Sequence, residues 1–126
     1  MTSVVLIDTS AWIDFFRGKQ TATADAVQLA LQLGAARLCG PVKAELLQGV
    51  KTKKEKQQLQ VMFSAVENLS TNEADWETAG NSLQMLREGG VTLPLTDALI
   101  AAIANRHKAI VLTLDHHFSH LKVQLT

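Results

Sequence analysis

A chain of 126 residues fits one domain, residues 1–126, and is long enough to bury a hydrophobic core without disulfides. Hydrophobic residues make up 47% of the chain and charged residues 19%, a composition that excludes an intrinsically disordered protein. The formal net charge is zero. This balance does not by itself favour a nucleic-acid-binding protein, because such proteins are usually basic.

Cysteine content and apolar runs indicate where the protein resides. Cys39 is the single cysteine, which excludes an intrachain disulfide and favours a small buried side chain in a reducing compartment. Residues 1–8 have no basic segment and end in a carboxylate, unlike a signal peptide. Apolar runs stay well short of the roughly 20 residues that a membrane span needs. We therefore expect a soluble, cytoplasmic protein.

Charge is distributed unevenly along the chain. Lysines crowd residues 43–56, and acidic residues follow over residues 67–88. The basic stretch fits either a surface that follows nucleic-acid phosphates or an ordinary solvated helix surface, and both interpretations stay open.

Short apolar runs alternate with helical patterns in the first part of the chain. A β-branched run at residues 3–7 predicts a buried strand, and Asp8-Thr9-Ser10 predicts the start of a helix over residues 10–17. Apolar residues at helical spacing predict a helix over residues 24–33 that ends at a glycine, and a brief strand follows at residues 36–39.

The rest of the chain continues this alternation. Proline is tolerated in the first turn of a helix, so Pro41 predicts the start of a helix over residues 41–49. Thr96 is expected to cap an apolar helix. The remaining elements are helices at 53–65, 72–88 and 97–106 and strands at 66–69 and 109–113. Short strands separated by helices indicate an α/β sandwich with a mostly parallel sheet.

Four carboxylates occupy comparable positions in these elements. Asp8 follows the first strand, Asp97 lies in the first turn of a helix, and Asp115 lies just beyond the last strand. Ligands bind outside the carboxyl ends of parallel strands, so we expect these side chains at one edge of the sheet. Glu45 can reach the same edge from the helix after the second strand. Any one of these acids also fits ordinary helix capping.

Such a set of acids favours one kind of chemistry. Four converging carboxylates repel one another and have raised pKa values unless a cation lies between them. Oxygen ligands suit Mg²⁺ or Mn²⁺, which keep positions for water and phosphate oxygens. Such an ion lowers the pKa of a bound water, holds the phosphate and stabilises charge on the pentacoordinate transition state, so hydrolysis of a phosphodiester is the reaction that we expect.

Four ordered motifs carry a resemblance to a known family. They read DTSAWID at residues 8–14, PVKAEL at 41–46, LTDALIA at 95–101 and LTLDHHF at 112–118. In order and spacing they resemble the signatures of PIN-domain nucleases, and more narrowly those of VapC-type toxins of bacterial toxin–antitoxin pairs. The resemblance extends over essentially the whole chain.

The resemblance implies a three-layer α/β/α fold, dependence on Mg²⁺ or Mn²⁺, endonucleolytic cleavage of RNA, a homodimer and inhibition by a VapB-type antitoxin. Asp8 and Asp97 would be the principal metal ligands, and Glu45 and Asp115 would complete the acidic site. Three hydroxyl side chains are candidates to hydrogen-bond these carboxylates or water: Thr9, Ser10 and Thr113.

Histidines and aromatic residues near the motifs allow two further expectations. His117 stands where many relatives carry another acid, and we interpret His116, His117 and His120 as part of a short surface helix rather than as metal ligands. An aromatic stripe of Trp12, Phe15 and Phe16 fits either the core or a surface that receives a partner segment. On the second interpretation, an antitoxin segment anchors beside the stripe and inserts an arginine or lysine among the four acids.

Two alternatives to a toxin stay open. One is a housekeeping RNA-processing nuclease of the same fold. The other is a catalytically inactive PIN-like module that only binds protein or RNA. Retention of all four acids disfavours the inactive module, because a dead copy has no need of mutually repelling carboxylates.

Overall fold

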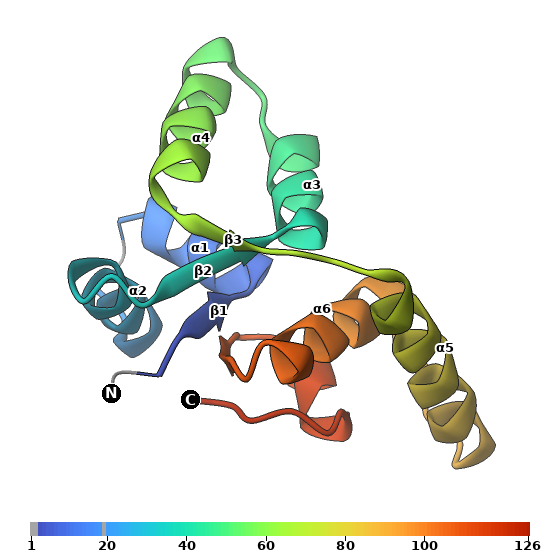
Figure 1. Cartoon of the computed structure of the whole chain (residues 1–126). Helices are drawn as coiled ribbons and strands as arrows, with labels where there is room; N and C mark the ends of the chain where they lie inside the picture. The colour runs from blue at the N-terminus through green and yellow to red at the C-terminus, as the bar shows by residue number, and fades with distance from the viewer. Residues whose placement is uncertain (1–2, 19) are drawn as a thin grey trace.

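The computed structural model describes residues 3–18 and 20–126 and has a four-stranded parallel sheet at its centre (Figure 1). The strand order is β3-β2-β1-β4, and Val5 pairs with Ala36 on one side and Ile110 on the other. The strands are β1 (Val5–Ile7), β2 (Ala36–Cys39), β3 (Glu67–Leu69) and β4 (Ile110–Leu112). The expectation of a parallel sheet is confirmed, and it places the carboxyl ends of all four strands at one edge.

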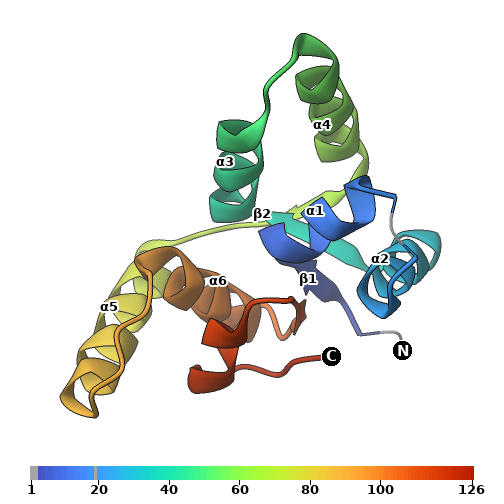
Figure 2. The same ribbon diagram turned by 180° about the vertical axis from the view of Figure 1, so that it is seen from behind.

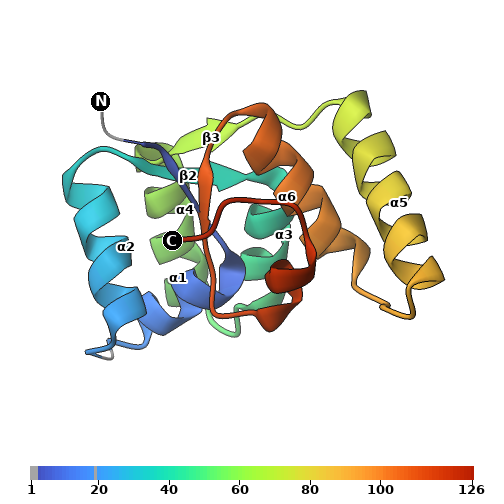
Figure 3. The ribbon, with the colours of Figure 1, turned by 90° about the horizontal axis from the view of Figure 1, so that it is seen from below.

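Helices lie on both sides of this sheet, which confirms the three-layer arrangement. The chain rises through α3 and returns through α4 on one side (Figure 2), and α5 lies outermost, packed along α6 (Figure 3). The helices are α1 (Thr9–Phe16), α2 (Ala22–Gln32), α3 (Gly40–Gly49), α4 (Lys53–Ala65), α5 (Glu73–Glu88), α6 (Leu95–Arg106) and the short 3₁₀ helix η1 (His116–His120). Among the described residues, no helix has the length and apolar character to cross a membrane.

Helix α6 and the central strands form the core. Every residue of α6 from Asp97 to Ala104 is buried, and so are Leu6, Val111 and Phe118 around it. Burial of a valine, leucine, isoleucine or phenylalanine side chain contributes about 1.5–3 kcal/mol to stability. Helix α6 is therefore firmly packed in the core and fixes the position of Asp97 in its first turn. Cys39 is also fully buried, as expected, and burial raises the pKa of its thiol to about 12.

The start of α6 differs from the expectation. The N-cap residue is Pro94 rather than Thr96, and the helix begins at Leu95. Pro94 has an extended backbone with φ −63° and ψ 143°, and its carbonyl oxygen accepts the first bond of the helix from the Ala98 N–H. The expected cap at Thr96 is therefore wrong, because the chain already turns at the proline. Asp97 consequently lies well inside the first turn.

Candidate active site

Neighbouring strands bring two of the predicted acids to one edge of the sheet. Asp8 follows β1, and its backbone N–H donates to the carbonyl of Leu112 at 2.9 Å, so it lies directly beside the end of β4. Asp115 follows that strand after two intervening residues. Asp8 is the N-cap residue of α1, yet its carboxylate makes no capping hydrogen bond to the described backbone. Helix capping therefore does not explain this acid.

Hydroxyl groups orient the Asp8 carboxylate. Ser10 donates to Asp8 Oδ2 at 2.9 Å, and Thr113 donates to the same oxygen at 2.8 Å. Thr113 Oγ1 also accepts the backbone N–H of Asp115 at 2.9 Å, which fixes the segment that carries the next acid. The hydrogen bonds expected for Ser10 and Thr113 are present.

Glu45 reaches the same place from α3. Thr9 Oγ1 donates to Glu45 Oε1 at 2.8 Å, so the third hydroxyl expected near the acids also contacts a carboxylate. Burial raises the pKa of Glu45 above its ordinary value, and the negative charges of Asp8, Asp97 and Asp115 raise it further. Glu45 therefore lies within electrostatic reach of the other three acids.

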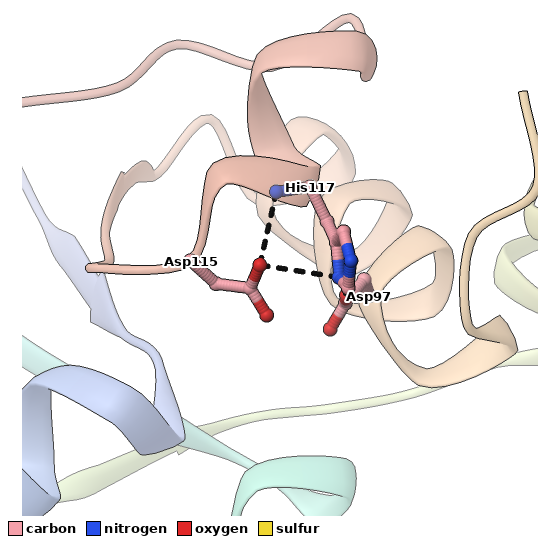
Figure 4. A group of neighbouring side chains, drawn as sticks. All are labelled: Asp97, Asp115 and His117. Carbon is pink, nitrogen blue, oxygen red and sulfur yellow. Dashed lines mark hydrogen bonds and ion pairs between the residues drawn. The ribbon is translucent and has the colours of Figure 1, made fainter.

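Asp97 and Asp115 both contact the imidazole of His117 (Figure 4). His117 Nδ1 lies 2.8 Å from Asp97 Oδ2 and 3.1 Å from Asp115 Oδ1. Asp115 Oδ1 also accepts the backbone N–H of His117 at 2.9 Å, which caps η1. One ligand atom from each of the three residues lies within 4.8 Å of the others, the spacing of a potential metal site.

Charge and burial at this cluster favour a bound cation. Burial raises the pKa of the Asp97 carboxyl, and Asp115 and Asp8 raise it further against the lowering effect of the His117 hydrogen bond. The hydrogen bond to Asp97 raises the pKa of His117. Asp8 and Asp97 are 3% and 6% exposed, whereas the side chains of Asp115 and His117 are 34% and 45% exposed. The cluster is thus buried on one side and open to a substrate on the other.

The sequence predicts His117 as part of a short surface helix and not as a member of the acidic site. The histidine group was expected on a short surface helix, and η1 confirms that helix. The chain turns directly from Asp115 into η1, however, and this turn directs the His117 ring toward Asp97 of α6. The pair Asp97 and His117 is 20 residues apart in sequence, so only the packing of η1 against α6 brings them together.

The aromatic stripe on α1 divides between core and surface. Trp12 is fully buried, which agrees with the core interpretation of the stripe, and its ring packs inside the protein against Phe15 and Phe16. Phe15 is partly buried, whereas Phe16 is 45% exposed and lines a pocket of about 500 Å³ between α1, α3 and α4. Glu45 lies in the lining of the same pocket, so the pocket leads to the acidic site.

Comparison with known proteins agrees with this architecture. A sequence profile of the PIN domain matches residues 5–124, and the chain belongs to the PIN-domain family. It is 33% identical over 119 residues to ribonuclease VapC11 of Mycobacterium tuberculosis and, to the same extent, to a VapC ribonuclease of Mycobacterium bovis. These alignments cover 91% of this chain and 89% of each relative.

Solved structures of low sequence identity share the fold. The structure of VapBC-1 from nontypeable Haemophilus influenzae matches 98% of this chain and 96% of its own with a TM-score of 0.79 at 19% identity. VapC20 of Mycobacterium tuberculosis, a toxin that cleaves the sarcin–ricin loop, matches 97% of this chain and 98% of its own with a TM-score of 0.69 at 15% identity.

Proposed function

We propose that this chain is an endoribonuclease that acts as the toxin of a toxin–antitoxin pair, within one domain spanning residues 1–126. It hydrolyses RNA phosphodiester bonds at the acidic site and is neutralised by a cognate VapB-type antitoxin. The observation that carries the proposal is the gathering of four carboxylates, two of them with raised pKa values, at the carboxyl edge of the sheet. The relatives named ribonucleases support the reaction, and RNA as the substrate favours the cytoplasm.

The donor set fits a divalent cation. Ser10 and Thr113 both use Oδ2 of Asp8, which leaves Oδ1 for an ion. Asp8 and Asp97 would be the principal ligands of Mg²⁺ or Mn²⁺, with Glu45 and Asp115 bound directly or through water. The ion would supply Lewis acidity, which lowers the pKa of water and neutralises charge on the phosphate.

The chain's own groups hold the site ready for this chemistry. Hydroxyl donors direct the carboxylates of Asp8 and Glu45, and the hydrogen bond from Thr9 favours the ionised form of Glu45 against the repulsion of the other acids. Substrate enters from the open side formed by Asp115 and η1. On another side, exposed lysines of α4 and of the turn before it, such as Lys51 and Lys54, offer positive charge to RNA phosphates.

Two surface pockets are the proposed binding sites of an antitoxin segment and of a second copy of the chain. The pocket of about 500 Å³ beside Phe16 would receive an apolar antitoxin segment whose arginine or lysine reaches Glu45. A second hollow between α3, α5 and α6 exposes Trp76 and Leu95, which suits the apolar face of a homodimer. Light scattering of wild-type protein and of Trp76→Glu would test the dimer, which we expect the substitution to dissociate.

Cleavage of RNA by the purified chain tests the proposed activity. We expect cleavage with Mg²⁺ or Mn²⁺ and none in excess chelator, and full activity in chelator would contradict a metal-dependent mechanism. A housekeeping nuclease would cleave RNA without arresting growth on induction and would have no inhibitory partner encoded beside it. An inactive binding module would retain RNA without cutting it.

A further inference from the structure

His117 is the nitrogen donor among the acids, and its placement bears on which ion the site takes. This inference rests on the proposed metal-dependent site and concerns its selectivity. Nδ1 of His117 points at the two carboxylates rather than at solvent, although the side chain is 45% exposed (Figure 4). His116 next to it on η1 is exposed.

The spacing of the three donors suits ligands of one ion. Neighbouring ligands of an octahedral ion bound at about 2.1 Å lie about 3 Å apart. The separations of Nδ1 from the Asp97 and Asp115 oxygens are 2.8 Å and 3.1 Å, which bracket that value. The Asp115 carboxylate caps η1 through the His117 N–H, so the histidine and one acid are held as a unit.

We propose that His117 binds the metal ion directly through Nδ1, with any proton on Nδ1 released to solvent as the ion binds, and that the site therefore selects a first-row transition-metal ion such as Mn²⁺ over Mg²⁺. Mg²⁺ is hard and favours oxygen ligands, whereas a neutral imidazole bonds more strongly to transition-metal ions. Two carboxylates with one imidazole form a mixed donor set that distinguishes the two ions, which an all-oxygen set does poorly.

The test uses the full chain with Mn²⁺ as the probe, because this ion is paramagnetic and reports on nitrogen bonded to it. Pulsed electron paramagnetic resonance of the wild type is expected to show coupling to one imidazole nitrogen. His117→Gln and His117→Asp should lose this coupling, and His117→Asp should still bind Mn²⁺ through oxygen. His116→Gln is the matched control on the same helix and should keep the coupling.

Calorimetric titration gives a second readout that does not depend on activity. The ratio of Mn²⁺ to Mg²⁺ affinity should fall about tenfold or more in His117→Gln and stay at the wild-type value in His116→Gln. Wild-type protein without nitrogen coupling, or an unchanged ratio in His117→Gln, would overturn the inference. Either result leaves the proposed function standing if cleavage still needs a divalent ion, whereas cleavage in excess chelator would overturn the metal-dependent mechanism itself.

Discussion

Asp8 and Asp97 are nearly inaccessible carboxylates, and each accepts hydrogen bonds from side chains rather than acting as a helix cap. Asp8→Asn and Asp97→Asn keep the shape of the side chain and remove its negative charge. We expect each to lower the rate of RNA cleavage at least about 100-fold, because the electrostatic stabilisation of a charged transition state is lost.

Circular dichroism and thermal melting should show that both variants still fold. Asp25→Asn, in the exposed first turn of α2, is the matched control and should cleave at the wild-type rate. Cleavage by Asp97→Asn within a few-fold of wild type would exclude this acid from the metal site.

Glu45 predicts a stability effect with a definite sign. Its pKa is raised in the folded protein, chiefly by burial, so folding favours the protonated carboxyl. That favourable contribution is full below the ordinary pKa of the residue and is lost as the pH rises through the raised value. At pH 7 the ionised carboxylate therefore costs stability in the metal-free protein.

Glu45→Gln should raise the Tm of the metal-free protein at pH 7 by about 1 to 3 °C. The glutamine oxygen can still accept the hydrogen bond from Thr9. The difference should shrink as the pH is lowered below the ordinary carboxyl pKa, and exposed Glu88→Gln provides the control. A lower Tm for Glu45→Gln at pH 7 would contradict the repulsion between the acids.

Among secondary-structure elements, local patterns allowed the bounds to be predicted where neighbours along the chain decide them. Strand β2 (Ala36–Cys39) and helix α4 (Lys53–Ala65) begin and end at the predicted residues, since glycine, proline and capping residues flank them. The predicted cap of α6 at Thr96 was wrong, because the N-cap residue is Pro94, where the chain already turns into the helix. The position of His117 depends on contacts between η1 and α6, which no local pattern records.

Helices α5 and α6 are joined by an ion pair outside the active site. Asp75 is 2% exposed and accepts hydrogen bonds from Arg106 Nε and Nη2, each at 2.9 Å. It also completes the capping box with Asn72 at the start of α5. The Arg106 hydrogen bond is the main cause that lowers the pKa of Asp75.

Arg106→Ala should reduce the free energy of unfolding, because it leaves a buried carboxylate unpaired. Since the pKa of Asp75 is lowered in the folded state, its contribution is present above the ordinary pKa and is lost as the pH falls through the lowered value. The loss caused by Arg106→Ala should shrink in the same acid range. Urea unfolding measures it, and exposed Arg87→Ala should be neutral.

At the scale of the whole molecule, the charges balance to zero, and side chains of both signs line the pocket beside Phe16. Arg17 and Lys51 are its basic residues, and Glu45 and Glu55 are its acidic ones. A guanidinium or ammonium group of a partner is attracted to Glu45, which also belongs to the acidic site. A partner that fills this pocket would therefore cover the acidic site at Glu45.

Inhibition by an antitoxin segment predicts which side chains it needs. Trp12 is buried, so its replacement would disturb folding rather than binding. Ile13 and Phe16 are 38% and 45% exposed and line the pocket, which makes them the apolar residues that a partner helix can contact. Phe16→Ser should therefore weaken the partner's affinity at least about tenfold, which corresponds to ~1.4 kcal/mol.

The measurement is titration of the free chain with the product of the neighbouring gene, with RNA cleavage as a second readout. Met85 is an exposed residue of α5 and does not line this pocket, so Met85→Ser is the control and should bind as the wild type does. The complex of the wild type should not cleave RNA, and the Phe16→Ser complex should regain cleavage at partner concentrations that silence the wild type. A complex that cleaves as fast as the free chain, or equal affinity for Phe16→Ser and the wild type, would show that inhibition does not pass through this pocket.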